Sequence, residues 1–251
     1  DAHLVETSPA LERAQRATLA NVETPVAWSA DIALAPRGPS IILANEFFDA
    51  LPVRHFVKTA GGWCERLVGL NDKGELAFGL ADHVEPDLRV AAPEGAVIEV
   101  GAIAARLMNE IAARLVAEGG ALLVVDYGYT QTALGETLQA VARHAYVDPL
   151  AAPGEADLTT HVDFAALARA AKAAGARVQG PVTQGAFLRQ LGIAQRAEAL
   201  QKRATPEQSA DIARALERLA GTGDPKRTMG ALFKAMAVTH PDIPDLPGFF
   251  A

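Results

Sequence analysis

Residues 41–52, IILANEFFDALP, place an apolar run directly before a cluster of polar, acidic and aromatic side chains. Residues 41–44 are continuously apolar rather than alternating, which predicts a parallel β-strand covered on both faces. In an open parallel sheet, the side chains at the carboxyl ends of the strands point into a ligand crevice. We therefore expect Asn45, Glu46 and Asp49 to lie at such a crevice.

Two further apolar runs repeat the pattern of a strand that ends in an acid. Residues 2–5 are followed by Glu6, and residues 122–125 are followed by Asp126. Between these strands, residues 103–116 carry apolar side chains at helical spacing. This β-α-β alternation predicts an α/β domain built on a parallel sheet.

The other segments form an insert, a long loop and a helical final third, and we treat residues 1–251 as one domain. Turn signals in residues 55–80 predict an antiparallel meander of about three short strands. Residues 144–164 form a loop of the length that is usually functional. The remaining predicted elements are a helix after Ser8 and Pro9, a helix between Asp163 and Gly175, a strand at 176–179, a helical subregion at 185–225 with a capping box at Thr205 and Gln208, and a closing strand at 231–240.

The composition narrows the classes of partner and of site. The 251 residues carry a net charge of -7 without a cluster of lysine and arginine, which argues against a nucleic-acid partner. Cys64 is the only cysteine, so no intrachain disulfide and no zinc site built on paired thiolates is expected, and we predict no metal site. No uncharged apolar run reaches about 18 residues and no secretory leader is visible, so we expect a soluble chain without a membrane span.

Glu6 is the candidate for binding the ribose of a nucleotide-like cofactor. A carboxylate at the end of the second strand of such a sheet accepts hydrogen bonds from both ribose hydroxyls. The glycine-rich loop that normally accompanies it is not in the sequence, so we expect that loop upstream of Asp1. The alternative is that each acid only begins a loop and caps the next helix.

Six stretches of the chain together carry a family resemblance. They are HLVETSPALERAQRATLA, ILANEFFDALPVRHF, GGW followed by ERLVGL, LLVVDYGY, DLTTHVDFAALA and FKAMAVTHP. From Asp1 to about Pro241, the chain resembles the MidA-like family of S-adenosylmethionine-dependent methyltransferases. The resemblance implies a class I methyltransferase sheet of Rossmann-like, seven-stranded form with S-adenosylmethionine as the cofactor. It also implies kinship with a mitochondrial arginine methyltransferase that is needed for assembly of respiratory complex I.

The predicted site combines this resemblance with the chemistry of the side chains. The cofactor-binding set is Glu6, Ser8, Asn45 and Glu46, and the catalytic set is Glu46, Asp49, Asp126 and His161. Carboxylates hold a guanidinium group through paired, charge-assisted hydrogen bonds, so the clamp is Glu46 with either Asp49 or Asp126. His161 is a base or a substrate contact, or it is equally a residue bonded to backbone.

Aromatic side chains next to these acids have two interpretations. Phe47, Phe48 and Tyr127 are placed to stack on a planar cation. For the two phenylalanines, core packing after the strand is the alternative. Trp63 and Cys64 lie in the predicted meander and are expected to be packing residues rather than catalytic ones.

The leading hypothesis is a protein arginine methyltransferase of the bacterial cytoplasm or the mitochondrial matrix, acting on a respiratory complex I subunit or its bacterial counterpart. A nicotinamide-dependent oxidoreductase is an alternative, because an acid at a strand end also binds the ribose of NAD. A non-catalytic assembly factor is another, holding a partner through the insert and the helical final third. A homodimer is left open.

Overall fold

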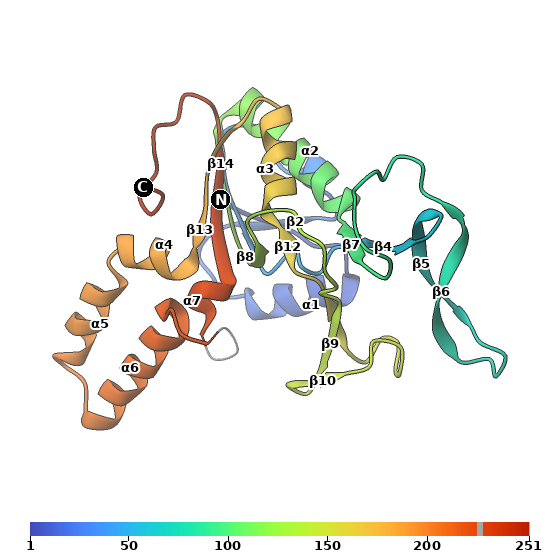
Figure 1. The fold of residues 1–251 in the computed structure, drawn as a ribbon. Coiled ribbons are helices and arrows are strands. Elements are labelled where there is room, and N and C mark those ends of the chain that lie inside the picture. The colour runs from blue at the N-terminus through green and yellow to red at the C-terminus, as the bar shows by residue number, and fades with distance from the viewer. Residues whose placement is uncertain (225–227, 251) are drawn as a thin grey trace.

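The computed structural model is a mixed α/β structure, and it describes residues 1–224 and 228–250 (Figure 1). The last residue of the predicted helical subregion, 225, lies outside the described residues. The helices are α1 (Pro9–Thr18), the 3-10 helix η1 (Ile32–Leu34), α2 (Ala102–Glu118), α3 (Phe164–Ala173), α4 (Gln184–Gln190), α5 (Ile193–Gln201), α6 (Pro206–Ala220) and α7 (Met229–Leu232). The strands are β1 (Ala2–Val5), β2 (Val26–Ser29), β3 (Ser40–Asn45), β4 (Arg54–Thr59), β5 (Gly62–Leu70), β6 (Leu76–Val84), β7 (Val97–Val100), β8 (Gly120–Tyr129), β9 (Gln139–Ala142), β10 (Ala145–Val147), β11 (Asp157–Thr159), β12 (Val162–Asp163), β13 (Arg177–Thr183) and β14 (Phe233–Thr239).

Strand β8 is the centre of a five-stranded sheet. On one edge it pairs antiparallel with β14, which in turn pairs antiparallel with β13. On its other edge, β3 pairs parallel with its first six residues and β12 pairs parallel with its last two. The predicted closing strand is therefore confirmed, and β8 is the strand that positions the ends of β3 and β12.

Three smaller sheets surround the central one. Strands β1 and β2 form a parallel pair of their own. The segment that contains the predicted meander forms a four-stranded antiparallel sheet in the order β6-β5-β4-β7. In the long loop, β9 pairs with both β10 and β11.

Helices α2 and α3 lie together on one face of the central sheet (Figure 1). The core fills the layer between them because both helices turn an apolar stripe toward the sheet. Its fully buried members, with no more than 2% of their surface exposed, are Met108, Ala112, Leu115, Leu122, Val124, Phe164, Leu167, Ala171, Met236 and Val238.

The predicted helix caps are confirmed. The Ser8 hydroxyl accepts a hydrogen bond from the amide of Leu11, with Pro9 at the first helical position. The Asp163 carboxylate caps α3 in the same way, and Thr205 with Gln208 forms a complete capping box at α6. The sequence predicts these caps because each depends on residues only two or three positions apart.

The expectation that residues 41–44 are covered on both faces is wrong. Burial alternates along β3, and the side chains of Ile41 and Leu43 are 85% and 73% exposed. Among the described residues, β3 is paired on one edge only, with β8. One face of β3 packs on the core through Ile42 and Ala44, and the other face lies open.

The expectation that the third strand ends at Asp126 is also wrong. Strand β8 continues to Tyr129, and its burial alternates, so Leu122, Val124, Asp126 and Gly128 all point to the same buried side. Asp126 is therefore a buried acid within a strand rather than the first residue of a loop.

We predict that Gly128→Ala destabilises the fold, because an added Cβ would lie 2.1 Å from the carbonyl oxygen of Val162 on β12. Overpacking of this kind costs about 1–3 kcal/mol. Urea unfolding measures the loss, with Gly69→Ala as the matched control, since nothing lies within 4 Å of a Cβ there. Equal free energies of unfolding for the two variants would contradict the close pairing of β8 and β12.

Candidate active site

The carboxyl group of Asp126 holds the turn that follows β3. Its Oδ2 accepts hydrogen bonds from the amides of Phe47, Phe48 and Asp49 at 3.2, 3.0 and 3.3 Å. Its Oδ1 accepts one from the amide of Tyr127 at 2.9 Å. Since Asp126 is fully buried, this group fixes the backbone of the predicted site and does not itself reach solvent.

Burial, together with the charge of the neighbouring Asp49, raises the pKa of Asp126 to about 7, against the lowering effect of the amide hydrogen bonds. Desolvation disfavours the charged form, and a second carboxylate nearby does the same. The group thus titrates near neutrality instead of being ionised throughout the physiological range.

Glu46 is the residue at which β3 leaves β8. Its φ of 46° is in the left-handed region, which is strained for a residue with a side chain. Its amide still donates to the carbonyl of Val125 at 3.0 Å. Asn45 lies beside it, with Nδ2 3.4 Å from Glu46 Oε1, and both side chains are exposed. The turn therefore presents an amide and a carboxylate to the outside.

Asp49 faces inward from the same turn and is 5% exposed. Its Oδ2 accepts a hydrogen bond from the Tyr127 hydroxyl. Its Oδ1 is buried and has no hydrogen-bond partner among the described residues. The Tyr127 ring meets His161 edge-on at 5.4 Å between ring centroids and Phe233 at 5.3 Å. Three of the four predicted catalytic residues, Asp49, Asp126 and His161, are thus brought together around Tyr127.

A buried carboxylate that the sequence reasoning missed lies next to His161. Glu99, on β7, accepts hydrogen bonds from the amide and hydroxyl of Thr137, at 2.7 and 2.5 Å. The Thr137 hydroxyl oxygen accepts one from the amide of His161 at 2.9 Å. The signal was present in the sequence, because Glu99 is a single acid in the apolar run 97–100.

Burial lowers the pKa of His161, with Glu99 opposing that shift and Lys234 reinforcing it. Burial also lowers the pKa of Lys234. The Lys234 ammonium donates to the carbonyls of Ala231 and Leu232 at 2.8 and 2.7 Å. His161 is therefore held toward its neutral form, in which one ring nitrogen can accept a proton.

Glu6 and Ser8 form a separate group at the end of β1. One Glu6 oxygen accepts the Ser8 amide at 2.8 Å and the other accepts Gln15 Nε2 at 3.0 Å. Gln15 in turn accepts a hydrogen bond from the Trp28 ring nitrogen at 2.9 Å. The Glu6 carboxylate is thereby oriented by the N-cap residue of α1 and by Gln15 on α1, while the Ser8 hydroxyl is occupied as the helix cap.

The aromatic residues singled out in the sequence differ in how deeply they are buried. Phe48 is buried in the core, Phe47 is 40% exposed, and their rings meet edge-on at 5.2 Å. Trp63 and Cys64 are buried in the four-stranded sheet, so their expected packing role is confirmed.

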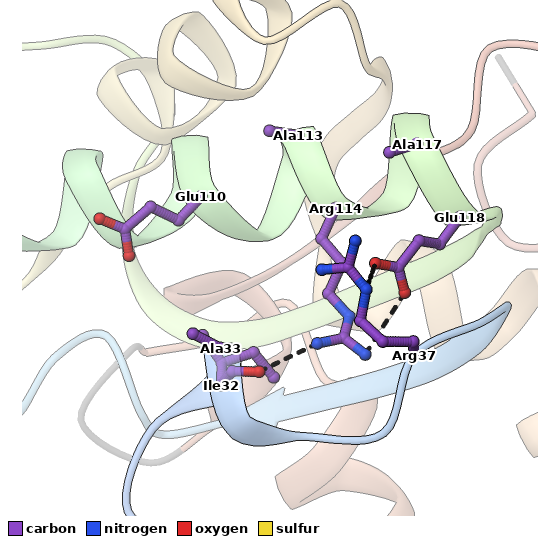
Figure 2. Close-up of a pocket in the computed structure, with 8 residues that line it drawn as sticks. All are labelled: Ile32, Ala33, Arg37, Glu110, Ala113, Arg114, Ala117 and Glu118. Carbon is purple, nitrogen blue, oxygen red and sulfur yellow. Dashed lines mark hydrogen bonds and ion pairs between the residues drawn. The ribbon is translucent and has the colours of Figure 1, made fainter.

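A hollow of about 350 Å³ lies between α2 and the segment around η1, separate from the predicted site residues (Figure 2). Figure 2 shows Arg114 reaching from α2 toward Ile32, whose carbonyl it contacts at 3.0 Å, with Glu118 and Arg37 beside it. None of the predicted site residues lines this hollow. Its polar groups tie the loop before β3 to the helix.

No group of three or more His, Cys, Asp or Glu side chains within residues 1–224 and 228–250 is arranged to hold a metal ion. No helix in the same part of the chain is long and apolar enough to cross a membrane.

Comparison with known proteins identifies the family. Residues 1–182 match the family described as "Putative S-adenosyl-L-methionine-dependent methyltransferase", and the chain belongs to this family. A zebrafish (Danio rerio) relative named "Protein arginine methyltransferase NDUFAF7, mitochondrial" is 34% identical over 95% of this chain and 61% of its own length. The mouse (Mus musculus) protein of the same name is 36% identical over 76% of this chain and 49% of its own length. The chain thus spans about half to three fifths of these relatives.

Solved structures confirm the fold. A COG1565 superfamily protein from Burkholderia thailandensis superposes with a TM-score of 0.83 at 29% identity, covering 99% of this chain and 68% of that one. A second structure from that organism, described as a likely methyl transferase bound to S-adenosyl-homocysteine, gives 0.82 at 28% identity, covering 99% of this chain and 66% of that one. The class I methyltransferase fold and S-adenosylmethionine as the cofactor of the family follow, and the nicotinamide alternative is not favoured.

We predict that Asp126 makes stability depend on pH. Between about pH 4 and 7 the native state keeps a proton on Asp126 that the unfolded chain has lost, so stability falls as the pH rises through this window. The slope approaches about 1.4 kcal/mol per pH unit. Subtracting the urea-unfolding free energy of Asp126→Asn from that of the wild type isolates the effect, and a difference that does not vary with pH would contradict it.

Proposed function

We propose that the chain forms the substrate-facing side of an S-adenosylmethionine-dependent protein arginine methyltransferase. The observation that carries the proposal is the turn after β3, which presents Glu46 to solvent and keeps one oxygen of Asp49 without a partner among the described residues. The names of the relatives support arginine as the modified residue.

The residues at the end of β1 fit the cofactor. S-adenosylmethionine supplies a methyl group already attached to its leaving group, so the protein needs no nucleophile of its own. Each Glu6 oxygen has one donor in place and keeps acceptor capacity for a ribose hydroxyl. Ser8 takes part through its backbone amide, which orients Glu6. Asn45 and Glu46, at the end of β3, are proposed to contact the methionine part.

The guanidinium group of the substrate is held by Glu46 and Asp49. Asp49 Oδ1 is a buried acceptor without a donor among the described residues, and such an atom costs free energy until a donor reaches it. A guanidinium offers five N–H donors in a rigid plane, so two carboxylates hold it in one orientation. Asp126 acts as a positioning residue, because its hydrogen bonds fix the amides of residues 47–49.

His161 is proposed to take the proton that leaves the guanidinium. Its lowered pKa favours the neutral imidazole near pH 7, which is the form that accepts a proton. Its edge-on contact with Tyr127 ties it to Asp49 through the Tyr127 hydroxyl. The exposed Phe47 is placed to stack on the planar cation.

The partner is a protein that presents an arginine, which suits a chain of net charge -7. By the family resemblance, that partner is a respiratory complex I subunit or its bacterial counterpart. The proposed compartment is the cytoplasm if the chain comes from a bacterium, and the mitochondrial matrix if it comes from a eukaryote. A second copy of the chain is the other proposed partner.

We predict that Glu46→Gln in the full-length protein lowers kcat/KM for methyl transfer at least about 100-fold, because it removes a charge-assisted contact to the guanidinium. Cofactor binding is expected to persist. Transfer from a radiolabelled methyl donor into cell extract measures the loss. Glu23→Gln is the control, since Glu23 is an exposed carboxylate outside the predicted site. Wild-type activity in Glu46→Gln would remove Glu46 from the site.

We predict that Glu6→Gln weakens binding of S-adenosylmethionine about 10-fold or more, since one charged acceptor of the ribose hydroxyls is lost. Isothermal titration calorimetry of the full-length protein measures it. Glu12→Gln is the matched control, because Glu12 lies on the neighbouring helix α1 and its carboxylate pairs, among the described residues, with Arg16. Equal affinities for Glu6→Gln and Glu12→Gln would refute the ribose assignment.

A further inference from the structure

The far part of the β5–β6 hairpin, residues 66–80, projects from the body of the molecule (Figure 1). We call it the distal hairpin. Large apolar side chains are exposed on both of its faces, and a two-stranded hairpin of this kind is marginally stable in water. These side chains are Leu67, Val68, Leu70, Leu76, Phe78 and Leu80. Such a surface marks an interaction site.

The outer edge of β6 is unpaired among the described residues, because β6 is the first strand in the order β6-β5-β4-β7. The amide of Asn71 donates to the carbonyl of Glu75 at 2.9 Å. This bond determines which residue pairs of β5 and β6 are hydrogen-bonded to each other and which are not. By the alternation of an antiparallel pair, Ala77 and Gly79 bond to β5, while residues 76, 78 and 80 point their backbone groups outward. Three residues therefore offer donors and acceptors along the edge.

This edge lacks the features that keep edge strands apart. Residues 76–81 contain no charged residue and no proline, and lysine or proline is the usual protection. The sequence 76–80, LAFGL, reads nearly the same in both directions about Phe78. A strand that reads alike both ways matches itself when two copies run antiparallel about a two-fold axis.

We propose that β6 pairs antiparallel with β6 of a second copy of the chain, with the two-fold axis at Phe78. Leu76 then lies opposite Leu80 of the other copy, and Ala77 opposite Gly79. The two four-stranded sheets join into one sheet of eight strands. The outward backbone groups of residues 76, 78 and 80 are satisfied by their own counterparts, so the assembly closes as a dimer.

A second copy fits this edge better than the arginine-bearing substrate does. A cationic peptide needs carboxylates, and residues 76–81 offer none. The polar side chains of Asp82 and His83 lie outside the paired run and remain solvated, with Asp82 wholly exposed. Arg66, 4.7 Å from the Phe78 ring, is already engaged by Glu136. The edge is thus apolar and neutral, as a pair of identical strands requires.

Analytical ultracentrifugation of the full chain tests the proposal. We expect the wild type to sediment as a dimer at micromolar concentration, and Phe78→Asp to sediment as a monomer with an unchanged circular dichroism spectrum, because two like charges would face each other at the axis. Leu34→Asp, at an exposed apolar residue on η1, is expected to remain a dimer. A wild-type monomer, or a dimer that survives Phe78→Asp, overturns the proposal.

Disulfide trapping supplies a second measurement that does not depend on the stability of Phe78→Asp. Directly paired residues on neighbouring strands have Cα atoms about 5.5 Å apart, within disulfide range. Phe78→Cys is therefore expected to form a covalent dimer under mild oxidation. Val68→Cys, at a residue that is also exposed on the same face but lies one strand further in, is expected to stay monomeric on a denaturing gel. Equal trapping at both positions, or trapping with a different protein instead, contradicts the pairing.

Discussion

The buried carboxyl group of Asp126 joins the centre of the sheet to the turn that carries the proposed site. Strand β3 stays paired with β8 as far as Val125, and β12 begins its pairing at Gly128. Asp126 lies between these two points and accepts the amides of residues 47–49, which no longer have a strand to bond. The direction of the turn, and with it the orientation of Glu46 and Asp49, depends on this one group.

Local signals in the sequence predicted the longer helices, their caps and the closing strand, because each is set by neighbours within one or two turns of the chain. The closing strand begins two residues later than predicted, since residues 231 and 232 belong to α7. The exposed face of Ile41 and Leu43 was not predictable, since a continuous apolar run looks the same whether or not a neighbour covers it. Asp126 was predicted to lie at the end of a strand but lies within β8, because a buried acid within a strand resembles a strand end in the sequence. Glu99 was not singled out, although it too is a single acid within an apolar run.

The four-stranded sheet connects the distal hairpin to the site. His55 on β4 lies 3.4 Å from Glu99 on β7, and Glu99 leads through Thr137 to His161. The other His55 ring nitrogen contacts Arg66 at 2.7 Å, at the base of the distal hairpin. One polar network therefore supports both the proposed proton acceptor and the strand that is proposed to pair with a second copy.

The most direct test is mass spectrometry of proteins incubated with the full-length protein and a deuterated methyl donor. Cell extract is incubated with S-adenosylmethionine that carries a trideuterated methyl group, and labelled peptides are sequenced. Labelled methyl groups are expected on arginine side chains, and at least about 100-fold less label when Glu46→Gln replaces the wild type. Label confined to another residue type would contradict the arginine site, and no label although the cofactor binds would contradict the methyltransferase activity and favour a non-catalytic role.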